Sequence, residues 1–141
     1  MPDTAANLPL DQRIEQFLAG APHAVVGASA DRAKYGNKVL RVYQQRGRPV
    51  FPVNPHAKQI EGLQAYRDLA SLPQKPHGIS IITPPPITEK IVEQAAALGI
   101  KHLWMQPGAE SERAIALARQ HHMNCIAGDA CILVVLRFRE G

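Results

Sequence analysis

Short runs of β-branched and aliphatic residues alternate along this chain with longer amphipathic segments, and this alternation constrains the fold more than any other feature. The runs expected to form strands lie at residues 23–28, 49–53, 78–83, 101–106 and 124–127, with a weaker one at 62–66. Apolar residues recur at helical spacing between them, as in Val39, Leu40 and Tyr43 before Gly47. Strands separated by helices predict an α/β protein with a parallel sheet.

The helices are expected from about residue 10 to Gly20, after the first strand to Gly47, from about Ile87 to Gly99 and over about 109–121, with one helical turn at 68–72. The chain of 141 residues has the size of one domain. We therefore expect a single domain over residues 1–141.

Composition excludes several classes of protein. The hydrophobic share of 45% and the charged share of 20% are typical of a globular protein, and the longest aliphatic run, 132–136, is too short to cross a bilayer. The first residues carry neither a basic head nor an apolar stretch, so we expect a cytoplasmic protein without a membrane partner. Cys125 and Cys131 lack CxxC spacing and the six histidines show no ligand pattern, so neither disulfides nor a metal site are expected.

Positive charge is concentrated in one segment. Between residues 32 and 58 there is no acid, and there are seven basic residues: Arg32, Lys34, Lys38, Arg41, Arg46, Arg48 and Lys58. Such a one-sided field suits a multiply charged small ligand or a nucleic-acid backbone, and a solvated helix face is the alternative. Aromatic residues make up only 5% of the chain and no recognition motif is visible, so a nucleic-acid partner is not expected.

The first expected strand ends in Gly27-Ala28-Ser29. Gly27 permits a tight bend, Ser29 offers a hydroxyl, and free N–H groups at the start of the next helix can hold a phosphate. The dinucleotide fingerprint needs glycines at i, i+2 and i+5, where this chain has Gly27, Ser29 and Arg32. Taken alone, the turn is equally well an ordinary strand end.

Polar residues follow other strands, and the carboxyl ends of parallel strands meet at one edge where ligands bind. Asn54, Pro55 and Lys58 follow the second strand, where an NAD site usually places a carboxylate. NAD is therefore disfavoured, NADP stays open on charge, and Asn54-Pro55 could mark only a turn. Gln106 ends the strand at 101–106, whereas Trp104 is expected in the core.

Three prolines follow Thr83 at the end of the strand 78–83. Proline lacks an N–H, so Pro84, Pro85 and Pro86 cannot continue a strand. They would form a rigid apolar lip that packs against an adenine or a pantetheine arm, or they simply stop the strand.

The chain resembles the stand-alone coenzyme A-binding domain proteins in a combination of five motifs. These are VGAS, PVNP, a strand ending in TPP, LWMQPG and Asp129-Ala-Cys131. Those proteins are similar to the nucleotide-binding domain of the succinyl-CoA synthetase α subunit and to that of ADP-forming acyl-CoA ligases. The resemblance runs from about residue 12 to 137. It implies a Rossmann-like, doubly wound, three-layer fold with strand order 3-2-1-4-5 that binds coenzyme A (CoA) or an acyl-CoA across its carboxyl edge.

The resemblance also implies which residues meet the ligand. It assigns Gly27, Ala28, Ser29 and Ala30 to the phosphates, Lys58 to the nucleotide, and Thr83, Pro84 and Pro85 to the flank of the bound cofactor. CoA carries a 3′-phosphate, and Arg32, Lys34 or Lys38 is placed by sequence to reach it. Asn54, Pro55 and Gln106 complete the expected cofactor-binding set.

The C-terminal part departs from the family. Many relatives have Cys-Pro followed soon by a carboxylate, whereas no acid follows Cys131 until Glu140, so any role of that carboxylate is not transferred. A mixed disulfide between Cys131 and the CoA thiol is one hypothesis, and a buried apolar thiol is the alternative.

No catalytic residues are assigned. The related synthetases phosphorylate a histidine on a further domain, which we do not expect here, and no GxSxG elbow or Walker lysine is present. We expect a CoA or acyl-CoA carrier or sensor, with a protein partner left open. The alternatives are a small CoA-dependent transferase or an NADP-binding oxidoreductase.

Overall fold

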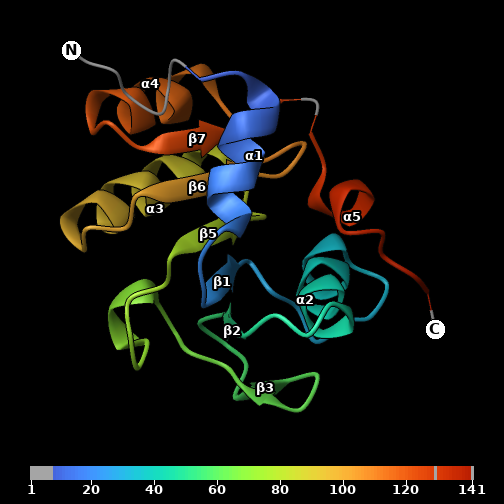
Figure 1. Ribbon diagram of the computed structural model, residues 1–141. Helices are drawn as coiled ribbons and strands as arrows, with labels where there is room; N and C mark the ends of the chain where they lie inside the picture. The colour runs from blue at the N-terminus through green and yellow to red at the C-terminus, as the bar shows by residue number, and fades with distance from the viewer. Residues whose placement is uncertain (1–7, 129, 141) are drawn as a thin grey trace.

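Five parallel strands form the central sheet of the computed structural model, which describes residues 8–128 and 130–140 (Figure 1). They are β1 (His23–Val26), β2 (Val50–Val53), β5 (Gly78–Ile81), β6 (His102–Met105) and β7 (Asn124–Ile126), in the spatial order β2-β1-β5-β6-β7. Val26 pairs with Val53 on one side and with Ile81 on the other, so the strands end level with one another. The residues that follow them meet along one edge, the carboxyl rim. Asp129 lies outside the described residues, and so do the first seven residues, which contributed to the expectation of a cytoplasmic protein.

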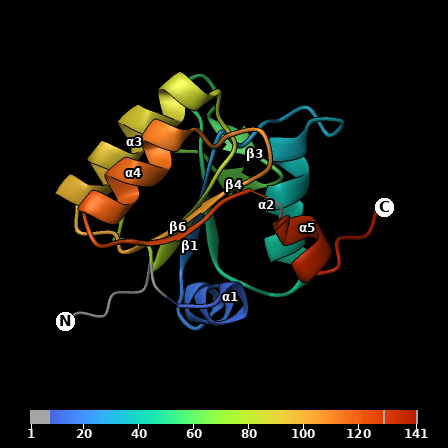
Figure 2. The same ribbon diagram turned by 90° about the horizontal axis from the view of Figure 1, so that it is seen from above.

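Helices cover both faces of the sheet. Figure 2 shows α3 (Pro85–Ala97) and α4 (Glu112–Gln120) on one side and α2 (Tyr35–Gln45) and α5 (Ile132–Val135) on the other. The first helix, α1 (Leu10–Leu18), lies near the amino ends of the strands, opposite the carboxyl rim. This three-layer arrangement confirms the predicted Rossmann-like, doubly wound α/β fold.

Two apolar clusters fill the space between the layers. Ile79, Ile81, Val92 and Leu103 belong to the cluster beneath α3 and α4. On the other face Trp104 is fully buried, as expected, and meets Phe17 edge to face with 5.3 Å between ring centroids.

The predicted strand at 62–66 is only partly present. Residues 63–64 form β4 (Leu63–Gln64), which pairs antiparallel with β3 (Gln59–Ile60) in a separate ribbon. Tyr66 makes one parallel bridge to Val53 at the end of β2. The strand numbered 3 in the predicted order 3-2-1-4-5 is therefore reduced to a single bridge beside β2. At the opposite edge of the sheet, β7 adds a strand that this order did not include.

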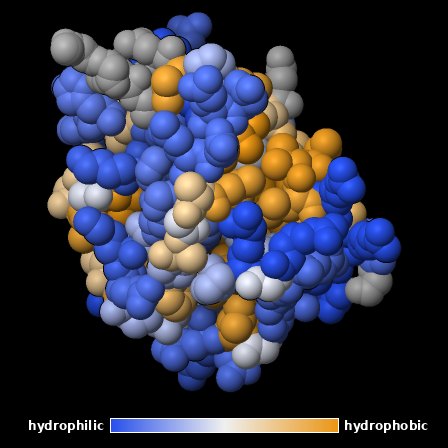
Figure 3. Space-filling model, viewed as in Figure 1, coloured by the Kyte–Doolittle hydropathy of each residue, from blue (hydrophilic) through white to orange (hydrophobic). Residues whose placement is uncertain are grey.

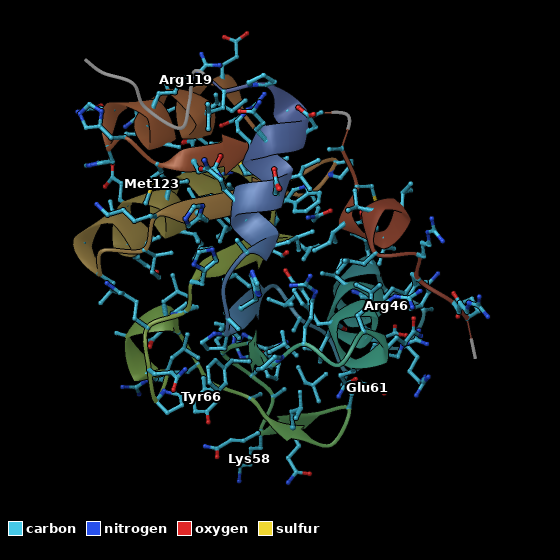
Figure 4. The ribbon with its side chains drawn as sticks, in the orientation of Figure 1. Arg46, Lys58, Glu61, Tyr66, Arg119 and Met123 are labelled. Carbon is cyan, nitrogen blue, oxygen red and sulfur yellow. The ribbon has the colours of Figure 1, made fainter. Side chains whose placement is uncertain are left out.

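Residues 132–135 form α5, a helix that the sequence did not predict. Arg46 anchors the segment that follows α5, because its Nε donates to Leu136 O (2.6 Å) and its Nη2 to Arg137 O (2.8 Å) (Figure 4). Val134 is 76% exposed, and Figure 3 shows hydrophobic side chains gathered over this helix. No helix within residues 8–128 and 130–140 has the length and apolarity needed to cross a membrane.

Candidate functional site

Two glycines shape the turn after β1. Gly27 has φ +96°, and a Cβ on it would lie 1.9 Å from the backbone oxygen of Ile82. Gly36, in the first turn of α2, would place a Cβ 2.1 Å from the backbone oxygen of Gly27. A side chain at position 27 would push the turn away from the end of β5, and one at position 36 would push α2 away from the turn. Sequence reasoning found Gly27 and missed Gly36, although a glycine just inside a helix start is the signal of such a close approach.

A hollow of about 420 Å³ opens at this turn, and we call it the glycine hollow. Its lining consists of Gly27, Ala28, Ser29, Lys34, Tyr35, Gly36, Asn54, Pro55 and Ile82. The helix begins at Tyr35, so the N–H groups of Tyr35 and Gly36 have no partner within α2. Backbone donors at a helix start and a lysine beside them suit a phosphate group. Six of the predicted residues meet in this hollow.

Two asparagine side chains hold the turn in place. Asn54 Nδ2 donates to Ala28 O (2.8 Å), and its Oδ1 accepts from His56 N (2.7 Å). The buried Asn37 donates from Nδ2 to Ser29 O (2.8 Å) and to Glu61 Oε2 (3.0 Å). Asn54 therefore lines the hollow and also closes a turn, so the two interpretations given for Asn54-Pro55, a site residue and a turn residue, are compatible. Asn37 was not predicted.

A second hollow of about 580 Å³, the proline hollow, adjoins the first. It is lined by Tyr35, Ile82, Thr83, Pro84, Pro107, Gly108, Ala109 and Cys131. Because Tyr35 and Ile82 line both hollows, the two are neighbours along the rim. Of the predicted residues, Thr83 and Pro84 line this hollow, whereas Pro85 starts α3 and lines neither hollow.

Tyr35 stands at the junction of the two hollows. Its hydroxyl bonds with Cys131 Sγ and donates to Gln106 Oε1 (3.4 Å). Burial, together with the bond to Cys131, raises the pKa of Tyr35 above its ordinary value, so the hydroxyl stays protonated. Gln106 is fully buried, and its Oε1 also accepts from Ile132 N (2.9 Å) at the start of α5. Gln106 therefore lies behind the hollows and fixes the groups that line them.

The basic segment is not one-sided in space. Arg32 pairs with Glu61 (3.0 Å) and Lys38 with Glu140 (3.1 Å), acids that lie far away in the sequence. Figure 4 shows Glu61 beside α2. Lys34 lines the glycine hollow and has no ion-pair partner in the described part of the chain.

Lys58 lies in a third hollow of about 650 Å³, the lysine hollow. Its lining is Ala57, Lys58, Gln59, Gln64, Ala65, Tyr66, Arg67 and Ser71. Figure 4 shows Lys58 and Tyr66 beside the β3–β4 ribbon. In the chain, only His56 separates this lining from that of the glycine hollow. Ala30 is exposed and lines none of the three hollows.

Three histidines pack together at the opposite, amino edge. The ring centroid of His77 is 5.8 Å from that of His23 and 4.3 Å from that of His102. Burial lowers the pKa of His23 and of His102 to about 4, so both are neutral at pH 7. His23 Nε2 bonds with Phe17 O (2.8 Å) and His77 Nε2 with Gln16 O (2.9 Å), both backbone carbonyls of α1. The partner of His102 Nδ1 is the side-chain amide of Asn124 (3.0 Å). Among residues 8–128 and 130–140 no group of three or more His, Cys, Asp or Glu side chains is arranged to hold a metal ion.

A doubly wound sheet with adjoining hollows along its carboxyl rim is the architecture of a nucleotide-binding domain. Residues 22–137 match the family model described as the CoA binding domain, and the chain belongs to that family. The resemblance seen in the sequence is thereby confirmed.

The curated relatives are larger proteins. The α subunit of ADP-forming acetate–CoA ligase II from Pyrococcus furiosus is 26% identical over 89 residues, which are 62% of this chain and 20% of that protein. ADP-forming acetate–CoA ligase I from Archaeoglobus fulgidus is 24% identical over 119 residues, or 77% of this chain and 17% of the ligase. The chain therefore spans about a fifth or less of the length of these relatives.

Solved structures show the same fold in two settings. A conserved hypothetical protein from Pyrococcus furiosus has a TM-score of 0.78 and 38% identity, and the match covers 82% of this chain and 99% of that one. The dinucleotide-forming acetyl-coenzyme A synthetase 1 of Ca. Korarchaeum cryptofilum has a TM-score of 0.67 and 26% identity, covering 76% of this chain and 26% of the synthetase. The fold occurs both as a small chain and within a larger enzyme.

Proposed function

We propose that this chain binds coenzyme A, free or acylated, along the carboxyl rim and carries no catalysis of its own. The observation that supports this most is that the glycine and proline hollows adjoin at Tyr35 and Ile82 in a chain of the CoA binding domain family. Phosphates suit the first hollow, which offers backbone N–H groups and Lys34. The pantetheine arm suits the second, whose lining is mainly apolar.

The charges favour particular cations for the phosphates of the ligand. Arg32 and Lys38 each have an acidic partner, whereas Lys34 and Lys58 line hollows on either side of the Asn54–Pro55 turn. We therefore propose Lys34 and Lys58 as the main phosphate contacts. The lysine hollow also contains Tyr66, whose ring could pack against the adenine.

A binding role fits the size of the relatives. The matched segment is a small part of ligases that join acetate to CoA, so a partner protein is the proposed source of any chemistry. That the chain works in the cytoplasm stays a prediction from its sequence.

Titration calorimetry of the full chain with CoA, NADP and a short oligonucleotide tests the proposal. CoA should bind saturably and, at about one hundred times its Kd, should stabilise the fold by about 2.7 kcal/mol in thermal unfolding. Lys34→Ala should weaken CoA binding. The matched control Lys101→Ala, an exposed lysine before the amino end of β6, should not. Tight binding of NADP without any binding of CoA would reject the proposal in favour of the oxidoreductase alternative.

A further inference from the structure

The proline hollow offers no charged side chain to a ligand. Its lining is Tyr35, three aliphatic or glycine residues, Thr83, two prolines and Cys131, and none of these is a Lys, Arg or His. Tyr35 stays protonated because burial raises its pKa. With a volume of about 580 Å³ the hollow is larger than the glycine hollow beside it, at about 420 Å³. A group attached to a thiol that enters this hollow therefore meets lining residues that carry no charge.

The helix that starts at this hollow is unable to hold an anion. A helix N-terminus normally presents free N–H groups to negative charge. Pro84 caps α3 and lines the hollow, but the next two residues, Pro85 and Pro86, have no N–H. The N–H groups of Ile87 and Thr88 already donate to Pro84 O (2.9 and 3.0 Å). The first turn of α3 thus presents no donor, in contrast to the start of α2.

The opposite wall, the turn after β6, is closed to anions in the same way. Pro107 has no N–H, Gly108 N donates to Glu110 Oε1 (2.9 Å), and Ala109 N donates to Gln106 O (2.9 Å). The Glu110 carboxylate adds a negative charge at this turn. A second carboxylate brought into the hollow would find no cation among the lining residues and would be repelled by Glu110.

We infer that the proline hollow accepts CoA thioesters with uncharged acyl groups and rejects thioesters that end in a carboxylate. The inference rests on the proposed function, since the acyl end reaches this hollow only if the phosphates of CoA occupy the glycine hollow. It assigns a ligand class to the site: acetyl-CoA or butyryl-CoA, and not succinyl-CoA.

Titration calorimetry of the full chain with CoA, acetyl-CoA, butyryl-CoA and succinyl-CoA tests this. Acetyl-CoA and butyryl-CoA should bind at least as tightly as CoA, and succinyl-CoA at least about tenfold more weakly than acetyl-CoA, because Glu110 repels its carboxylate and no cation in the lining offsets that charge. Pro84→Arg places a cation in the hollow and should reduce that ratio several-fold. Ile87→Arg adds the same charge at a residue that is 43% exposed and lines none of the three hollows, so it should leave the ratio unchanged.

Each outcome bears on a distinct claim. If CoA binds and succinyl-CoA binds as tightly as acetyl-CoA, the inference is overturned while the proposed function stands. If none of the four ligands binds, both fail together. If succinyl-CoA is weak but Pro84→Arg leaves the ratio unchanged, selection does not occur in the proline hollow. Should Pro84→Arg fail to fold, Pro107→Arg puts the cation on the opposite, exposed wall and serves the same purpose.

Discussion

Replacing Gly36 with alanine should destabilise this protein, although the same change inside an ordinary helix stabilises. Alanine is preferred over glycine in a helix by about 1 kcal/mol. Against that gain, the new Cβ would lie 2.1 Å from the backbone oxygen of Gly27, whereas Cβ contacts under 3.0 Å essentially never occur. Overpacking costs roughly 1–3 kcal/mol, and an obstacle made of backbone rather than a flexible side chain calls for the upper value. The net expectation is a loss of about 2 kcal/mol.

Thermal unfolding followed by circular dichroism measures this loss. For a chain of this size about 2 kcal/mol corresponds to a fall in Tm of roughly 8 °C. CoA affinity should fall as well, because the start of α2 moves away from the turn that lines the glycine hollow. Gly47→Ala is the matched control, since its φ of +66° brings strain but no atom lies within 4 Å of its Cβ. It should lower Tm and leave CoA affinity unchanged. A Gly36→Ala protein with unchanged Tm would refute the close approach of α2 to the turn.

The other predictions concern charge, pH and thiol chemistry. Lys34→Ala or Lys58→Ala should weaken CoA about tenfold more than dephospho-CoA if that lysine meets the 3′-phosphate, and equal losses in calorimetry would reject the contact. Stability in urea should fall as pH drops from about 7 toward 4, because the pKa of His23 is about 4 when folded and about 6.5 when unfolded, so the unfolded chain takes up the proton first. His23→Gln should flatten that slope, and an unchanged slope would contradict the assignment. The partly exposed Cys131 thiol should exchange with CoA disulfide, forming a Cys131–CoA disulfide and releasing one CoA thiol, while the buried Cys125, whose pKa burial raises to about 11, stays unmodified. Intact-mass spectrometry checks this, and an adduct that persists in Cys131→Ser would disprove the site.

The sheet could be predicted because its strands are buried on both faces and therefore read as continuous apolar runs. All four residues of β1 and of β5 are buried. The β3–β4 ribbon could not be predicted, since strands of two residues carry no periodicity. The helix α5 was missed for the same reason, because a four-residue apolar run fits a strand as well as a helix.

The site residues that follow strand ends could be predicted from the sequence. Contacts between residues far apart in the sequence could not. Gly27, Asn54 and Thr83 each follow a strand, and parallel strands bring such residues to one rim. The pairing of Arg32 with Glu61 joins residues 29 positions apart through the β3–β4 ribbon, whose existence the sequence did not indicate. The acid-free segment therefore looked more positive in the sequence than it is in space.

Glycines are absent from two positions of the dinucleotide fingerprint because, in this chain, the close backbone contacts that require glycine occur at other positions. Gly27 meets the first demand, a positive φ with a close approach to the next strand end. The last demand, close packing of the helix, falls on Gly36, because α2 starts only at Tyr35 and the connection from β1 is longer. At the middle position Ser29 has a task of its own, since its Oγ accepts from Asp31 N (3.0 Å) and shapes the loop. The spacing of the glycines thus depends on the length of the connection between β1 and α2. The longer connection also contains Lys34, whose side chain lines the glycine hollow, whereas a short connection would offer only backbone groups there.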